Sequence, residues 1–139
     1  MIILDTNVAS EMMKSSPELR VLAWLNAQTA SHVFITATSK AEILYGIERL
    51  PVGKKRDLLR SAANEMFERQ FRERVLPFDE IAAEAFAAIA ASRRRAGQPI
   101  GQFDCQIAAI ARARGSAVAT RDTADFADCG IELINPWAV

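Results

Sequence analysis

Residues Met1–Asn7 read MIILDTN, a run of four apolar residues that stops abruptly at Asp5. A short apolar run without polar alternation is typical of a strand that is buried on both faces of its sheet. Such strands occur in parallel sheets that helices cover on both sides. We therefore predict that the chain opens with an inner strand of an α/β protein, and that Asp5 lies where this strand ends in a loop.

Further strand signals recur along the rest of the chain. Apolar runs rich in Val, Ile and Leu predict four more short strands, at residues 33–36, 75–78, 117–120 and 131–134. Segments with helical periodicity separate them, usually two between one strand and the next. This alternation predicts an α/β fold, a three-layer α/β/α sandwich with a mostly parallel central sheet.

The helices between these strands are marked by their capping residues. Capping residues or changes in composition indicate helices that start near Ser16–Glu18, at Ser39 and at Asp79, a long one over 53–74, and one over 101–114. The helix after Asp79 has an expected inner face that includes Ile81 and Ile89. It should end at the cationic run Arg93–Arg95, because cations and a following glycine both favour a helix C-terminus.

Length and composition limit the classes of protein. The 139 residues, half of them hydrophobic, predict one globular domain over residues 1–139 that needs no disulfide to fold. The 17 basic and 17 acidic residues cancel, so the net charge indicates no partner. No apolar run approaches the ~20 residues of a membrane span, and Cys105 and Cys129 stand alone. We therefore expect a cytoplasmic protein with no membrane association and no thiolate metal site.

Asp104 is the most informative residue. On a helix with ~100° per residue it lies within about 60° of Ile100 and Ile107, in the middle of the apolar face. An unpaired buried carboxylate costs several kcal/mol, so it needs either a cation or a proton. An ion pair with an arginine such as Arg112 or Arg121, or a helix rim that is wetter than the pattern suggests, would explain the position without any function. A metal site would explain it as well.

Three other acids occupy positions that permit either a structural or a functional role. Asp5 and Asp122 each follow an apolar strand closely, where an aspartate can cap a turn or a helix. Glu42 stands three residues after Ser39, which fits the capping box S-x-x-E as well as it fits a ligand role. In parallel sheets, however, ligands bind beyond the carboxyl ends of the strands, near the switch in strand order.

Acids from separate segments that converge on one sheet end would favour a divalent cation. Oxygen ligands with almost no His or Cys select Mg²⁺ or Mn²⁺. Such an ion activates water and offsets charge on a phosphodiester, which is nuclease chemistry. The only histidine, His32, has no partner in the sequence, so we expect it on the surface and not as an acid or base for RNA cleavage.

Six motifs together resemble one family over essentially the whole chain. They are Ile3–Asn7, Ala41–Ile43 with Gly46, Leu76–Asp79, Asp104 with Ile107–Ala109, Ala119–Thr123 with Asp125–Phe126, and Asn135–Trp137. In order and spacing they are similar to the PIN-domain toxins of the VapC type, and to their FitB-like plasmid-stability branch. Any one motif is weak, but the set is specific.

The resemblance implies a function and a site. It implies a Mg²⁺-dependent endoribonuclease, the toxin of a type II toxin–antitoxin system, which hydrolyses RNA phosphodiesters with a metal-activated water. It also implies a small antitoxin partner that binds operator DNA, and a homodimer. The implied catalytic and metal-binding acids are Asp5, Glu42, Asp104 and Asp122. Thr6 and Thr120 adjoin matched acids and are candidates to orient them or a bound water.

The sequence leaves two other functions open, and it leaves the role of the basic residues open as well. An Asp-based phosphohydrolase or phospho-acceptor domain would use Asp5 as the nucleophile, but Asn7 stands where its second acid is expected. A PIN fold without activity would act only as a binding module. The basic runs Lys54–Arg56 and Arg93–Arg95 are candidate phosphate contacts or simply solvated, and no aromatic residue is interleaved with them. Asp125 is expected to cap a turn or face solvent.

Overall fold

The computed structural model describes residues 1–139 and contains one five-stranded sheet. The strand order is β3-β2-β1-β4-β5, and every neighbouring pair is parallel. The strands are β1 (Ile2–Leu4), β2 (Val33–Thr36), β3 (Val75–Leu76), β4 (Ala117–Ala119) and β5 (Leu133–Ile134). All five predicted strands are therefore present, although the third and the fifth are only two residues long.

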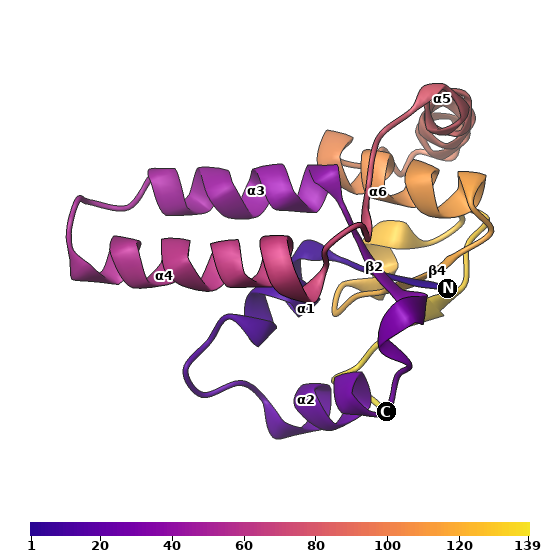
Figure 1. Ribbon diagram of the computed structural model, residues 1–139. Coiled ribbons are helices and arrows are strands. Elements are labelled where there is room, and N and C mark those ends of the chain that lie inside the picture. The colour runs from indigo at the N-terminus through magenta and orange to yellow at the C-terminus, as the bar shows by residue number, and fades with distance from the viewer.

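Six α-helices connect and cover these strands (Figure 1). They are α1 (Thr6–Met12), α2 (Leu19–Asn26), α3 (Ala37–Glu48), α4 (Lys54–Glu65), α5 (Glu80–Arg95) and α6 (Gln102–Ala113). A π-helical turn follows α4, and short 3-10 turns precede β2 and follow β4. None of the helices combines the length and the hydropathy that crossing a membrane requires.

The sheet separates two hydrophobic cores. Ile3 and Val118, which are partners in the register of β1 and β4, belong to the core that α5 and α6 complete. Leu4 and Ala119, the next pair along the same strands, belong to the core formed with α1, α2, α3 and α4. Successive strand residues therefore face opposite layers, as the pleat of a strand requires. This arrangement confirms the predicted three-layer α/β/α sandwich.

The central strand β1 fixes the position where the polar segments meet. It pairs with β2 on one side and with β4 on the other, so the strand order switches between β1 and β4. The backbone N–H of Asp5 continues this pairing and donates to the carbonyl of Ala119 at 2.9 Å. The segments that leave β1 and β4 are thereby brought together, although more than a hundred residues separate them in the sequence.

Two helix starts differ from the predictions. The chain does not enter a loop after β1, because the Asp5 side chain accepts a hydrogen bond from the Thr6 N–H and caps α1 directly. The next helix, α2, begins at Leu19 with Glu18 as its N-cap residue and no capping side chain, so Ser16 does not cap it. Leu19 itself is 78% exposed, and the helix packs on the core through Val21, Trp24 and Leu25 instead.

The helices on either side of β3 agree with the sequence in part. The predicted long helix over 53–74 is α4 followed by the π-helical turn, and regular helix ends at Glu65. Asp79 caps α5 as predicted, since its carboxylate accepts from the Ala82 N–H at 2.9 Å. Ile81, however, is 63% exposed and does not belong to the inner face of α5.

Arg93 has a structural role that the sequence did not predict. It is only 6% exposed, and its guanidinium donates to the carbonyls of Gln98, Asp125 and Ala127. Its charge therefore holds three main-chain acceptors at the end of α5 and beside the turn after β4. The neighbouring Arg94 is exposed, so the basic run is not a uniform solvated surface.

We predict that Arg93→Leu lowers the free energy of unfolding by about 2–4 kcal/mol, because it leaves buried carbonyls without donors. Urea denaturation followed by circular dichroism measures this loss. Arg94→Leu is the matched control and should change stability by no more than about 0.5 kcal/mol. Equal effects of the two substitutions would contradict the assigned role of Arg93.

Candidate active site

A cavity of about 410 Å³ opens beyond the carboxyl ends of β1 and β4. All four acids predicted from the sequence line it, and they come from four separate segments: Asp5, Glu42, Asp104 and Asp122. Its other lining residues are Thr6, Asn7, Ser10, Glu11, Lys14, Arg121 and Trp137. The position agrees with the rule that open parallel sheets bind ligands at the switch in strand order.

Asp5 is the most buried of the four acids, with 5% of its surface exposed. One carboxylate oxygen accepts from the Thr6 N–H at 2.8 Å and the other from the Thr120 hydroxyl at 2.7 Å. Burial raises the pKa of this carboxyl, while these two hydrogen bonds oppose the rise and the charges of Glu42 and Asp122 add to it. Asp5 therefore caps a helix, α1, which was the structural role that the sequence allowed, and it also lines the cavity.

Glu42 does not form the capping box that the sequence allowed. The N-cap residue of α3 is Thr36, whose hydroxyl accepts from the Ser39 N–H, so Ser39 already lies within the helix. The Glu42 carboxylate instead accepts from the Thr6 hydroxyl at 2.7 Å. Burial raises the pKa of Glu42, the Thr6 hydrogen bond opposes this, and the charge of Asp104 adds to it.

Asp104 lies in the first turn of α6 and is partly buried. It forms no ion pair, so the proposed pairing with Arg112 or Arg121 is wrong. Burial raises the pKa of its carboxyl to about 6, with the nearby charges of Asp5, Asp125 and Asp122 adding to the effect. Asp104, which interrupts the apolar face of its helix in the sequence, therefore also has an unusually high pKa in the folded protein.

Asp122 is held by Asn7, a residue of the first motif to which the sequence analysis assigned no role. The Asn7 side chain donates to the Asp122 carboxylate at 3.0 Å and accepts from the Arg121 N–H at 3.3 Å. The Thr120 hydroxyl, which donates to Asp5, accepts from the Asp122 N–H at 3.0 Å. Two short polar side chains therefore lock the segment after β4 onto the segment after β1.

The two sides of the site come from opposite layers of the fold. Glu42 lies on α3 and Asp104 lies on α6, and these helices contribute to different cores. The Thr38 hydroxyl of α3 donates to the Gln106 side chain of α6 at 2.9 Å. This hydrogen bond connects the layers four residues before Glu42 and two residues after Asp104.

No side-chain cation neutralises the four acids. None of the ion pairs of the protein includes them, and Lys14, which lines the cavity, pairs with Glu11 at 3.0 Å. Burial raises the pKa of Glu11, but hydrogen bonds from Lys14 and the Glu18 N–H, together with the charges of Lys14 and Arg121, outweigh burial and lower it. The cavity therefore holds an excess of negative charge in a partly dry setting, which attracts a cation.

The acids do not form a preassembled metal cage. No three His, Cys, Asp or Glu side chains are arranged so that they could hold one ion as they stand. Glu42 and Asp122 are already engaged by Thr6 and Asn7. An all-oxygen donor set of this kind fits a hard cation that keeps several waters and is bound through one or two carboxylates, as Mg²⁺ is.

Sequence reasoning gave no role to five residues that line the cavity, and it was right about one residue outside it. Asn7 and Trp137 stood in quoted motifs without a role, and Ser10, Glu11 and Lys14 were not considered. The partners of Asn7 and Trp137 are distant in sequence, and those of Glu11 depend on the fold of the following loop. His32 is exposed in the turn before β2, as expected.

Comparison with known proteins identifies the family. The PIN-domain family pattern matches residues 2–131, and the chain belongs to the PIN-domain family. Within that family it is similar to VapC-type and FitB-like toxins, which confirms the resemblance read from its motifs. It is 41% identical over 137 residues to the VapC ribonuclease Y4jK of Sinorhizobium fredii, covering 99% of this chain and 98% of that protein.

A further relative and a similar solved structure come from Neisseria gonorrhoeae. The toxin FitB is 38% identical over 137 residues, with 99% of both chains covered. A crystal structure of FitAcB superposes with a TM-score of 0.92 at 37% identity and covers the whole of both chains. The fold described above is therefore that of the FitB-like toxins.

We predict that Asp104→Asn stabilises the metal-free protein at neutral pH. The folded pKa of about 6 exceeds the ordinary value of 3.8, so this group's contribution to stability falls as pH rises from about 4 to 6. The substitution removes that penalty. Allowing for solvent screening, the free energy of unfolding should rise by on the order of 1 kcal/mol at about pH 7.5 and change little at about pH 4.

Urea denaturation at the two pH values, with a chelator present, tests this prediction. Glu84→Gln is the control, because Glu84 is an exposed carboxylate on α5 with no hydrogen-bond partner, and it should give no gain at either pH. A gain for Asp104→Asn that is the same at both pH values would refute the link to the Asp104 proton.

Proposed function

We propose that this protein is a Mg²⁺-dependent endoribonuclease and the toxin of a type II toxin–antitoxin pair. The single observation that carries the proposal is the cavity in which four carboxylates from four segments meet without a neutralising cation. The names of its relatives support RNA as the substrate. Besides Y4jK, they include the tRNA(fMet)-specific endonuclease VapC of Shigella flexneri, which is 32% identical over 136 residues.

In this proposal Asp5, Glu42, Asp104 and Asp122 hold the metal ion, one or two of them directly and the others through its water ligands. When bound, Mg²⁺ supplies an activated water and offsets the charge that develops on the cleaved phosphodiester. The protein's own groups prepare for this. Thr120 and the Thr6 N–H orient Asp5, and the Thr6 hydroxyl orients Glu42. Asp104, which retains its proton below about pH 6, would have to release it in order to bind a cation.

The geometry disfavours Asp5 as a covalent nucleophile. Its two carboxylate oxygens each accept a hydrogen bond, and the residue is almost fully buried. A phospho-acceptor needs an exposed oxygen with room for in-line attack. The side chain of Asn7, which stands where a second acid would be needed, is committed to Asp122 and Arg121.

The toxin assignment includes a small antitoxin as the partner. The similar solved structures are of toxin–antitoxin complexes, and some contain DNA. FitAB is bound to an IR36 DNA fragment, and VapBC from Salmonella typhimurium, with a TM-score of 0.79 and 27% identity, is bound to DNA. By this likeness the chain pairs with an antitoxin that also binds operator DNA. The homodimer implied by the family resemblance stays a prediction.

We predict that Asp104→Asn abolishes cleavage of single-stranded RNA in Mg²⁺ and weakens binding of Mn²⁺. The substitution removes an anionic ligand while keeping the size of the side chain. Cleavage is followed on a gel with and without a chelator, using protein freed of antitoxin, and Mn²⁺ binding is followed by calorimetry.

Glu84→Gln should retain wild-type cleavage and metal binding, because Glu84 lies on α5 away from the cavity. Unchanged, chelator-sensitive cleavage by Asp104→Asn would rule out the proposed role of this acid. A wild-type protein that binds no Mn²⁺ and cuts no RNA would instead favour a PIN fold that acts only as a binding module.

Thr120 provides a test of the positioning contacts. Thr120→Val keeps the size of the side chain but removes the hydroxyl that joins Asp5 to the Asp122 N–H. Because such supporting contacts typically contribute 10–100-fold to metal affinity or activity, we expect a loss of about that size in Mn²⁺ affinity. Thr120→Ser retains the hydroxyl and should retain most of the affinity; an equal loss in both variants would show that packing, not the hydrogen bond, matters.

A further inference from the structure

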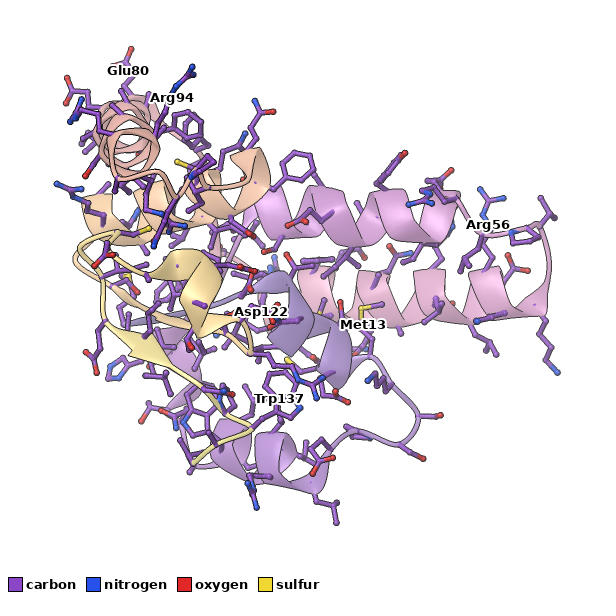
Figure 2. The ribbon with its side chains drawn as sticks, turned by 180° about the vertical axis from the view of Figure 1, so that it is seen from behind. Met13, Arg56, Glu80, Arg94, Asp122 and Trp137 are labelled. Carbon is purple, nitrogen blue, oxygen red and sulfur yellow. The ribbon has the colours of Figure 1, made fainter.

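Arg121 and Trp137 form a feature of the cavity that the proposed cleavage chemistry does not use. The Cζ atom of Arg121 lies 4.9 Å from the centre of the Trp137 ring, and both residues line the cavity that the four acids share. Trp137 is the one apolar residue of that lining. Figure 2 shows Trp137 beneath Asp122 at the side of the molecule where α1 lies.

We propose that Arg121, held against the face of Trp137, binds a backbone phosphate of single-stranded RNA next to the phosphodiester that is cut. The inference rests on the proposed ribonuclease function and names the subsite that positions its substrate. Trp137 is the positioning residue of this subsite, and Arg121 is the group that touches the RNA.

The guanidinium of Arg121 is free to bind an anion. Arg121 is exposed and forms no ion pair, although Asp122 adjoins it and Glu11 lines the same cavity. Lys14, the other cation of the lining, is already paired with Glu11. A guanidinium that rests on an aromatic face keeps its N–H donors, which lie in its plane, available for a phosphate.

Trp137 is anchored independently of Arg121. Its side chain packs against the core that α1 to α4 share, and its backbone N–H donates to the Asn135 side chain at 2.9 Å. Arg20 of α2 donates to its backbone carbonyl, also at 2.9 Å. The main chain of Trp137 is therefore held by hydrogen bonds and its side chain by packing, and ordering Arg121 on the indole before RNA arrives reduces the entropy lost on binding.

The backbone of Arg121 is fixed as well. Its N–H donates to Asn7, the preceding Thr120 donates to Asp5, and the following Asp122 accepts from Asn7. The same contacts that orient the acids therefore set the origin of the Arg121 side chain. Arg121, the one cation of the lining without a carboxylate partner, thus lies in the cavity that attracts a metal ion, where the negative charge of an RNA strand needs compensation.

The test measures RNA binding separately from cleavage. The Asp104→Asn protein binds a fluorescent single-stranded RNA oligonucleotide over a series of salt concentrations, so that cleavage does not interfere. Adding Arg121→Gln should weaken binding about tenfold at low salt. It should also reduce the slope of log K against log[salt] by about 0.7, the value for one phosphate contact on a single strand.

Arg94→Gln is the matched control, because it removes the same charge from α5, far from Asp122 and Trp137 in Figure 2. It should leave both affinity and slope unchanged. If Arg121→Gln leaves the slope as it was, the inference is wrong while the ribonuclease proposal stands. If the Asp104→Asn protein binds no RNA at any salt concentration, both are overturned.

A double-mutant cycle tests the role of Trp137. Trp137→Leu keeps an apolar contact with the core but loses the aromatic face, so it should weaken RNA binding, and adding Arg121→Gln to it should weaken binding little further. Trp137→Phe should restore most of the affinity. Additive losses from Trp137→Leu and Arg121→Gln would show that the indole does not position the guanidinium, and thermal unfolding separates this result from a general loss of folding.

Discussion

The parallel pairing of β1 with β4 is the constraint on which the site depends. It joins the N–H of Asp5 to the carbonyl of Ala119 and brings residues 5–7 against residues 120–122. The hydroxyl of Thr120 and the side chain of Asn7 then bridge the two segments. The apolar residues of both strands stabilise this pairing, because they are buried on both faces of the sheet. Without it, the acids at the ends of β1 and β4 would not meet.

The site also opposes the stability of the fold that builds it. Burial raises the pKa values of Asp5, Glu42 and Asp104, which means that the ionised groups are less stable here than in water. The protein partly offsets this with neutral hydroxyl and amide donors instead of cations. Neutral donors orient the carboxylates and leave their charge available, whereas an arginine in the same place would satisfy them permanently. Such a local conflict between stability and chemistry is common at functional sites.

The sequence was informative where the chemistry conflicted with the local pattern. Asp104 could be predicted because it interrupts an apolar helix face, and Asp5 and Asp122 because each follows a buried strand. Glu42 stayed ambiguous, since only the start of α3 at Thr36 excludes the capping box. Trp137 could not be given a role, because its partner Arg121 lies in another segment and becomes its neighbour only through the order of the strands.

The hydrogen bond between Thr38 and Gln106 joins two layers that otherwise belong to separate cores. Glu42 and Asp104 therefore lie on helices from opposite faces of the sheet, and these two helices meet at this hydrogen bond. A molecule that wedges α3 away from α6 at this seam would spread those two carboxylates without touching either of them. The separation of these two carboxylates is thus set by how the helices pack and not by the acids themselves.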